Sequence, residues 1–288
     1  MTIGGDAQRD TRTDPYLGTV VHLVASRQGR PNLPAGGCPF CVGGLEAPEP
    51  YTVRAFPNRW PSLGEGRCEV VLYTPDHDAT FASLGVEGAR RVIDLWADRT
   101  EAMRADPEVR FVLVFENRGA EVGATIAHPH GQVYAYDHVP DRPARRFAAG
   151  WRPDLDTVDR LVLERGGWRV VAQEAPVFPV ALSVAPMTRV ADLPALDATQ
   201  RDGLAAVLVD LFSRLDGLYG QPLPLMMWVN QAPSGGGAWP DPWLDVEIVS
   251  PWRAPGVARY IAAAEVACGE YVNPVAPEWV AERLRSLA

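Results

Sequence analysis

Apolar runs of strand length recur along the whole chain. Most of them end at Pro, Asp or Gly, the residues that commonly close a strand. Several are rich in the β-branched and aromatic residues that suit a pleated surface. We expect strands at residues 69–74, 110–117, 132–137, 168–176, 179–187, 225–233 and 243–251.

Two longer segments instead repeat their apolar residues at helical spacing. In the first segment, Val92, Trp96 and Met103 fall on one side. The second repeats this pattern around Leu204 and Leu208. We expect helices at residues 85–105 and 199–219, and shorter ones at residues 256–267 and 278–287.

The order of these elements indicates two halves of similar plan. Strands, a helix and further strands come first, and the same order resumes after residues 142–156, where polar residues and prolines interrupt the pattern. Strands mixed with a few helices are typical of the α+β class. We expect an α+β fold with a mostly antiparallel sheet and flanking helices. Its two halves would span residues 1–150 and 151–288.

Charge and composition exclude two classes of partner. The formal net charge is −9 and the pI is about 5.1, whereas nucleic acids and anionic membranes require a basic surface. The N-terminal segment, MTIGGDAQRDTRTDP, lacks the basic start and apolar core of a signal peptide. No run approaches the ~20 apolar residues of a membrane span. We therefore expect a cytoplasmic protein that binds neither nucleic acid nor membrane.

The segment ATIAHPHGQVYAY (residues 124–136) carries two imidazoles and an amide inside an apolar run. Side chains alternate sides in an extended chain, so His128, His130 and Gln132 face one way. Pro129 favours an extended conformation at His128 and stiffens the link between the histidines. Either the three side chains converge on one pocket, or the histidines form a hydrogen-bonded pair at a sheet edge.

The motif CPFC, from Cys38 to Cys41, is a second candidate cluster. A C-x-x-C pair serves as half of a zinc site, as a redox couple, or arises by coincidence. Glycines surround this pair, whereas a redox motif would open a helix after a strand. A metal site fits better, and His77 with one histidine of the HPH motif would complete a Cys₂His₂ set. The alternative for His77 is a solvated turn residue between Asp76 and Asp78.

A metal on His128 would leave His130 available for chemistry. A neutral imidazole, with a reference pKa near ~6.5, is a nucleophile or base at neutral pH. Attack on an α-phosphate would form a nucleotidyl-histidine and would require donors around the developing charge. The candidate donors are Gln132, Arg118 and the backbone of NRGAEVGAT (residues 117–125), which is neither a Walker loop nor a dinucleotide fingerprint.

The run FENRGAEVGATIAHPHGQ, with CPFC upstream and TPDH between, resembles galactose-1-phosphate uridylyltransferases, a branch of the histidine-triad superfamily. Further similar stretches are ASRQGRP, FPNRWPSL, ARYIAAAE and PEWVAERLR. The resemblance covers residues 16–287. It implies two histidine-triad-like halves, of which the N-terminal one (residues 1–150) is catalytic and binds the metal and the C-terminal one spans residues 151–288.

The resemblance implies a nucleotidylyltransferase with a ping-pong mechanism. His130 would attack the α-phosphorus of a nucleoside diphosphate sugar and pass the nucleotidyl group to a sugar 1-phosphate. Gln132 would hold a phosphoryl oxygen in the intermediate. A structural zinc would be bound by Cys38, Cys41, His77 and His128.

The resemblance also implies how the substrate is held. Asn58 would contact the ribose and Asn117 a phosphate. Arg27 and Arg30 would reach the phosphates from the partner subunit of a homodimer. The other expected substrate-binding residues are Arg118, Gly123, Thr125, Arg259 and Glu265.

The second half departs from the family pattern. Asn230, Asp245 and Glu247 stand where some members carry histidines for a second metal, so that site would be lost. Two carboxylates could still hold a harder cation. Arg259 replaces the usual lysine and Ala264 an expected aromatic residue, which implies a reshaped hexose pocket.

Two other functions are compatible with the same residues. Phosphate or water could accept the nucleotidyl group in place of a sugar 1-phosphate, which would make the protein a phosphorylase or a hydrolase. A non-catalytic, zinc-dependent nucleotide-binding protein would instead bind tightly, without turnover and without a covalent adduct. Product analysis with and without added sugar 1-phosphate distinguishes transfer from phosphorolysis or hydrolysis.

Overall fold

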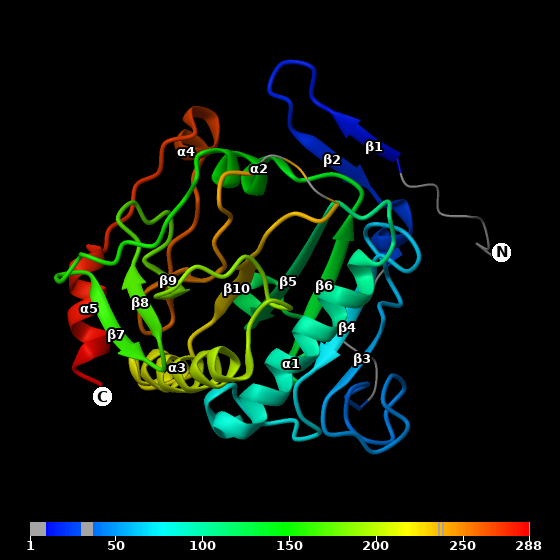
Figure 1. Ribbon diagram of the computed structural model, residues 1–288, viewed down its shortest axis with the longest axis horizontal. Helices are drawn as coiled ribbons and strands as arrows, with labels where there is room; N and C mark the ends of the chain where they lie inside the picture. The colour runs from blue at the N-terminus through cyan, green and yellow to red at the C-terminus, as the bar shows by residue number, and fades with distance from the viewer. Residues whose placement is uncertain (1–9, 30–36, 236, 238, 288) are drawn as a thin grey trace.

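A large antiparallel sheet forms the centre of the molecule (Figure 1). The computed structural model describes residues 10–29, 37–235, 237 and 239–287. Within these residues the sheet has nine strands: β3 (Arg54–Pro57), β4 (Cys68–Leu72), β5 (Phe111–Arg118), β6 (His130–Tyr136), β7 (Leu161–Arg165), β8 (Trp168–Ala172), β9 (Val180–Pro186), β10 (Leu225–Asn230) and β11 (Asp245–Ser250). Their order across the sheet is β3-β4-β6-β5-β10-β11-β9-β8-β7, with every neighbouring pair antiparallel. The expected α+β class and antiparallel sheet are confirmed.

Two long helices, α1 (Gly85–Arg104) and α3 (Ala198–Gly217), pack against each other and against the sheet (Figure 1). Both were expected from their apolar spacing. The first turn of α3 is capped because the Asp197 carboxylate accepts from the Gln200 N–H, while the Gln200 side chain accepts from the Asp197 N–H.

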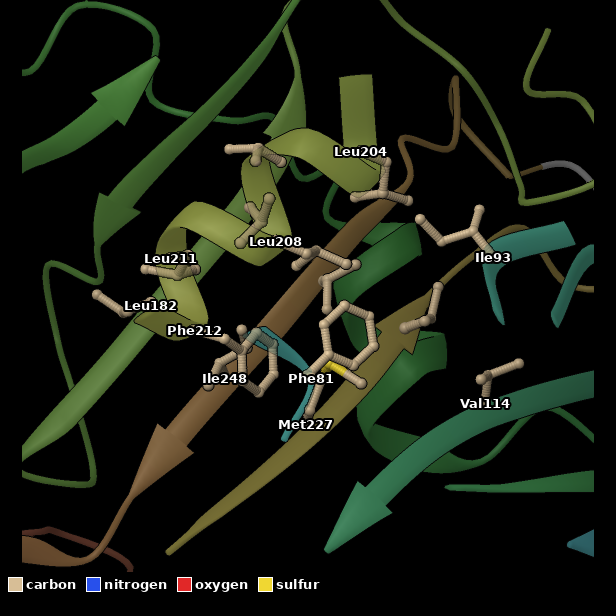
Figure 2. Packing of buried hydrophobic residues seen from close by; sticks show 14 of the residues in the cluster. Phe81, Ile93, Val114, Leu182, Leu204, Leu208, Leu211, Phe212, Met227 and Ile248 are labelled. Carbon is tan, nitrogen blue, oxygen red and sulfur yellow. The ribbon is translucent and has the colours of Figure 1, made fainter. Parts of the chain in front are cut away.

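The apolar side of α3 shares one core with both halves of the sheet. Leu208 and Phe212 are fully buried and face Leu182 of β9 and Ile248 of β11 (Figure 2). Phe81, which precedes α1, stacks on Phe212 with the ring centroids 4.8 Å apart. Burying side chains of this size contributes roughly 1.5–3 kcal/mol each, so this layer holds the sheet and helices together.

The two halves of the chain repeat one order of elements. Helix α1 connects β4 to β5, and β6 follows; helix α3 connects β9 to β10, and β11 follows. The halves join because β5 pairs with β10, with Phe115 opposite Trp228. Residues 142–156 were predicted to interrupt the pattern of elements. They begin inside a helix, α2 (Asp141–Ala148), which was not predicted from the sequence.

Smaller elements surround the sheet. A separate hairpin projects from the body (Figure 1), formed by β1 (Asp10–Thr13) and β2 (Val20–Leu23). The remaining elements are the strand pair β12 (Trp252–Ala254) and β13 (Val257–Ala258), the helices α4 (Ala263–Cys268) and α5 (Pro277–Arg285), and the 3₁₀ turns η1 (Ala25–Gly29), η2 (Ala82–Leu84) and η3 (Ala120–Val122). Helix α4 is shorter than expected because the start of the predicted segment forms β13. No helix in the described part of the chain is both long and apolar enough to cross a bilayer.

Candidate active site and metal centre

The two cysteines of CPFC lie against two histidines from distant parts of the chain. His77 follows β4, and His128 immediately precedes β6. One ligand atom from each of Cys38, Cys41, His77 and His128 lies within 4.8 Å of the others. Cys41 Sγ is 3.5 Å from Nδ1 of His77 and 3.7 Å from Nδ1 of His128. A Cys₂His₂ set this close fits the tetrahedral shell of a structural zinc ion.

The orientation of His128 suits metal binding. Its Nε2 atom lies 2.8 Å from the carbonyl oxygen of Thr74 and therefore donates to it. The Tyr51 hydroxyl lies 3.0 Å from the same nitrogen and donates to the carbonyl oxygen of Phe40. With the proton on Nε2, the lone pair is on Nδ1, which faces Cys41. The ring is fully buried and burial lowers the pKa of His128, which favours the neutral form that binds metals.

His130, the first residue of β6, is oriented for chemistry rather than for metal binding. Its Nδ1 atom lies 2.7 Å from the carbonyl oxygen of His128, which can only accept, so Nδ1 carries the proton. The lone pair of the neutral ring is then on Nε2. The ring of Phe40 packs edge-on against that of His130, with 5.0 Å between centroids. His130 therefore lies in a fixed tautomer on the wall of a cavity of about 740 Å³.

Gln132 lines the same cavity, two residues along β6. Its Oε1 atom accepts hydrogen bonds from Nδ2 of Asn58 at 3.4 Å and from the Tyr134 hydroxyl at 3.3 Å. Because the oxygen is engaged, the amide nitrogen of Gln132 is the end that can donate to a bound ligand. An imidazole lone pair and an amide donor on one wall are the groups that attack at phosphorus requires.

Gly131, between His130 and Gln132, has a steric reason to be glycine. A Cβ atom at this position would collide with the hydroxyl of Tyr73 and would lie 3.0 Å from the carbonyl oxygen of Phe115. Tyr73 is buried behind β6, and its ring packs edge-on against Trp96 of α1, with 5.9 Å between centroids. The helix layer thus supports the strand of His130 from behind, and only glycine leaves room for that support.

The chain is similar to a named family of proteins. A family model described as galactose-1-phosphate uridyl transferase, N-terminal domain, matches residues 58–140. A galactose-1-phosphate uridylyltransferase of Streptomyces lividans is 36% identical to the chain, over 97% of the chain and 87% of the relative. The chain belongs to the galactose-1-phosphate uridylyltransferase family. A further member, from Thermotoga maritima, is 30% identical over 96% of this chain and 98% of its own length.

Solved structures share the fold. A structure described as uridylyltransferase matches with a TM-score of 0.84 at 24% identity, covering 96% of this chain and 98% of that one. An ADP-glucose phosphorylase from Arabidopsis thaliana, solved with ADP-glucose, matches with a TM-score of 0.77 at 20% identity, covering 98% and 100%. The sequence relatives confirm the family and the enzyme class expected from the sequence, a nucleotidyltransferase.

Several of the residues expected to bind substrate lie at the cavity of His130. Asn58 and Thr125 line it beside His130 and Gln132. Arg27, on η1, lies close by and donates to the carbonyl oxygen of Trp60 at 3.2 Å and to the hydroxyl of Ser62. Arg30 lies outside the described residues.

Arg118 is not brought to the cavity. Alternation along β5 turns it to the helix side, where its guanidinium pairs with Asp216 at 2.6 Å and lies over the ring of Phe212. Its Nε atom also donates to the carbonyl oxygen of Leu223 at 2.9 Å. The expectation that Arg118 donates to a phosphate is corrected, because this side chain braces α3 against β5 instead.

Asn117 and Gly123 are not among the residues that line the cavity. Asn117 nevertheless shares the open face of the sheet with Gln132, since Phe115, two residues before it, lies opposite Gln132. Gly123 ends η3 with φ of 83°, a left-handed conformation that glycine adopts readily. Its visible role is to turn the chain toward Thr125.

Arg259 and Glu265 form a buried ion pair with each other. The other Glu265 oxygen accepts from the backbone N–H of Ala262 at 2.7 Å, and the pair also engages the backbone of Val272. Both Glu265 oxygens are therefore used within the chain, where they hold the segment around α4. Neither side chain lines the cavity of His130.

Arginine side chains pair with Asp245 and Glu247, the two carboxylates that could have held a second metal ion. Arg146 lies 2.8 Å from Asp245 and 3.1 Å from Glu247, and Arg142 lies 2.8 Å from Glu247. Asn230 also donates to Glu247, at 2.8 Å. Burial raises the pKa of Asp245 to about 7. The alternative of a hard cation here is corrected, because arginines already neutralise both groups.

Three residues near the site were not identified from the sequence. Tyr51 orients His128, Tyr134 donates to Gln132, and Ser62 contacts the hydroxyl of Tyr134. Tyr134 follows Gln132 by two positions, so the alternation that grouped His128, His130 and Gln132 also predicts its side. Tyr51 and Ser62 come from loops and carry no such signal.

Proposed function

We propose that the chain transfers the nucleotidyl group of a nucleoside diphosphate sugar to a sugar 1-phosphate, with His130 as the nucleophile. The relatives' names state uridylyl transfer to galactose 1-phosphate, and the proposal extends that reaction type to this chain. The observation that carries it is the hydrogen bond from Nδ1 of His130 to the carbonyl oxygen of His128, which leaves the lone pair on Nε2. Gln132 on the same cavity wall supplies a donor.

The reaction proceeds in two displacements at phosphorus. Nε2 of His130 forms a bond to the α-phosphorus of the nucleotide sugar, and the bond from that phosphorus to the bridging oxygen breaks, releasing sugar 1-phosphate. A phosphate oxygen of a second sugar 1-phosphate then attacks the same phosphorus, and the phosphorus–nitrogen bond breaks. The Gln132 amide donates to a phosphoryl oxygen throughout, where negative charge develops.

The cavity walls suit a nucleotide. Phe40 and Phe56 give an apolar surface for a base, and Asn58 and Thr125 offer polar groups for the ribose and phosphates. The family resemblance is the basis on which we assign Asn117, Gly123, Arg259 and Glu265 to substrate binding. Arg27 and Arg30 would act on phosphates across the interface of a homodimer.

Zinc is the proposed metal, bound by Cys38, Cys41, His77 and His128. All four positions would be filled by protein, so the ion would fix the position of the His130 strand rather than act on substrate. Thiol ligands must stay reduced, which suits a cytoplasmic enzyme. We also propose residues 1–150 and 151–288 as the two histidine-triad-like halves.

The proposal is tested by intact-mass measurement after mixing the protein with UDP-glucose or ADP-glucose in the absence of acceptor. The mass of one nucleoside monophosphate should be added to the wild type and not to His130→Ala. The matched control is His138→Ala, which removes a partly exposed histidine just after the same strand and should retain the adduct. A wild type without an adduct would count against the proposal.

The acceptor is then identified with the charged enzyme. Glucose 1-phosphate, galactose 1-phosphate, inorganic phosphate or buffer alone is added, and loss of the adduct is followed together with the nucleotide released. Transfer predicts rapid discharge with a sugar 1-phosphate and slow discharge in buffer. Equally rapid discharge by phosphate or by water would assign a phosphorylase or a hydrolase instead.

A further inference from the structure

We propose that Tyr134 and Ser62 are positioning residues that hold the amide of Gln132 with its nitrogen toward the substrate. The hydroxyl of Tyr134 lies between the two, 3.2 Å from Ser62 Oγ and 3.3 Å from Gln132 Oε1. Edge-on packing against Phe115, with 4.8 Å between ring centroids, fixes the direction of the Tyr134 ring. The inference rests on the proposed function, because it concerns how the phosphoryl donor is aimed.

This chain of hydrogen bonds begins at Arg27. A guanidinium donates and never accepts, so Ser62 Oγ accepts from Arg27. The Tyr134 hydroxyl has one hydrogen and donates it to Oε1 of Gln132, so in its contact with Ser62 it accepts the hydroxyl hydrogen of Ser62. Hydrogen bonds aligned in one direction polarise one another, which strengthens the last one.

A second donor-only group fixes the amide from the other side. The backbone N–H of Trp60 donates to Oδ1 of Asn58 at 2.9 Å, so the amide nitrogen of Asn58 faces away from Trp60. That nitrogen donates to Oε1 of Gln132 at 3.4 Å. Two independent donors therefore converge on one oxygen.

Rotating the Gln132 amide by half a turn would place its nitrogen against both donors. Two hydrogen bonds would be lost and like dipoles would meet, so the amide nitrogen stays directed away from Asn58 and Tyr134. A donor held in place before the substrate arrives requires no reorganisation when charge develops on phosphorus. Removing either donor should lower the rate of the chemical step more than the affinity for the nucleotide sugar.

The test is a double-mutant cycle on the first half-reaction. The rate of adduct formation on the wild type, Tyr134→Phe, Gln132→Ala and the double variant is followed by rapid quench with UDP-glucose as the probe. Gln132→Ala should lose on the order of 100-fold, as expected for a lost donor to a developing anion. Tyr134→Phe should lose about fivefold in rate with little change in KM, as expected when a transition-state interaction is weakened.

The decisive comparison is the effect of Tyr134→Phe in the Gln132→Ala background. If Tyr134 acts through Gln132, the double variant should be no slower than Gln132→Ala alone. The matched control is Tyr136→Phe, which removes a hydroxyl from the same face of β6 two residues further on and should keep the wild-type rate. Ser62→Ala should reproduce the loss in Tyr134→Phe, and Ser62→Thr, which retains a hydroxyl, should restore the rate.

Three results would overturn the inference. These are an equal fold-loss from Tyr134→Phe in both backgrounds, a loss confined to KM, or a full rate in both Tyr134→Phe and Ser62→Ala. Unfolding midpoints and metal content of each variant confirm that the folded protein is compared. A wild type that forms no adduct overturns the proposed function itself and this inference with it, whereas a reactive wild type with an additive cycle overturns only the positioning role.

Discussion

Nδ1 of His130 lies 2.7 Å from the carbonyl oxygen of His128, so the main chain of a metal-site residue fixes the tautomer of the proposed nucleophile. The ring of His128 is fixed in turn by the carbonyl oxygen of Thr74, 2.8 Å from Nε2. The structure thereby separates two roles for two imidazoles on either side of Pro129. A metal ion bound by His128 would therefore act on the proposed reaction through position, since His128 and His130 are joined by backbone.

Loss of a metal ligand should therefore abolish metal binding and slow adduct formation together. Wild-type protein should contain about one zinc ion per chain. Cys41→Ser should retain little metal, unfold at a lower temperature and form the His130 adduct more slowly, because His128 is no longer anchored. Elemental analysis, thermal unfolding and the rapid-quench rate measure these effects.

The control for that experiment is Cys268→Ser, which removes an exposed cysteine in α4 outside the metal site. It should retain the metal content and the rate of the wild type. Full metal content in Cys41→Ser, or an unchanged rate after complete metal removal, would contradict the positional role of the site.

Gly131→Ala should reduce both stability and activity. The added methyl group meets the Tyr73 hydroxyl and the Phe115 carbonyl oxygen, so β6 must move away from its support. Overpacking of this kind costs roughly 1–3 kcal/mol of unfolding free energy. Chemical denaturation and the rate of adduct formation measure the effect.

Removing the obstacle should recover part of that loss. Gly131→Ala combined with Tyr73→Phe removes the closest contact but leaves the ring and the Phe115 carbonyl oxygen nearby. Gly217→Ala is the control, because in α3 a Cβ would make only ordinary contacts with Leu287, and alanine favours a helix. Equal stabilities for the Gly131 single and double variants would rule out the steric explanation.

Arg146→Ala should be strongly destabilising, because it leaves the buried carboxylates of Asp245 and Glu247 without their shared partner. Breaking a buried ion pair in this way costs about 3–5 kcal/mol. Arg145→Ala is the matched control: its exposed side chain pairs with Asp141 at the surface, and its loss should cost less than about 1 kcal/mol. Denaturant unfolding of both variants at one pH provides the comparison, and similar losses would contradict the assignment.

Glu116 should make stability depend on pH in a direction opposite to that of most carboxylates. Burial raises the pKa of Glu116 to about 7, above its value in the unfolded chain. Between about pH 4 and pH 7 the unfolded chain loses this proton while the folded chain keeps it, so stability falls as pH rises; above pH 7 the effect is constant. The full difference is on the order of 3 kcal/mol.

Glu116→Gln removes this titration and preserves the shape of the side chain. The unfolding free energy of the wild type relative to Glu116→Gln should fall between pH 5 and pH 8. Both proteins keep the metal site, so its own pH dependence cancels in the difference. A difference that does not change with pH would show that Glu116 titrates normally.

Local patterns predicted the elements that bury a complete face. Alternation placed His130 and Gln132 on one side of β6, and helical spacing located α1 and α3, whose inward residues Val92 and Leu208 are fully buried. Helix α2 was missed because Phe147 is its only fully buried side chain among several charged ones. Its Arg146 acquires partners about a hundred residues away, which spacing along the chain does not reveal.

The site residues that lie in one short segment were predictable from the sequence, whereas those that come from separate loops were harder to predict. The residues themselves indicated a metal site formed by Cys38, Cys41, His77 and one histidine of the HPH motif. The family resemblance then assigned the metal to His128 and the chemistry to His130. Arg118 was misplaced because the glycine-containing stretch after it was treated as one phosphate loop, whereas β5 extends through Arg118 and turns it inward.

His130 is the residue that we propose to carry the nucleotidyl group. Wild-type protein mixed with UDP-glucose should be quenched without acceptor and digested, and the peptide that contains both histidines should be fragmented in a mass spectrometer. We expect a uridylyl group on His130, with none on His128, and we expect it to disappear when a sugar 1-phosphate is added before the quench. A uridylyl group on any other residue, or release of sugar 1-phosphate with no covalent adduct, would contradict it.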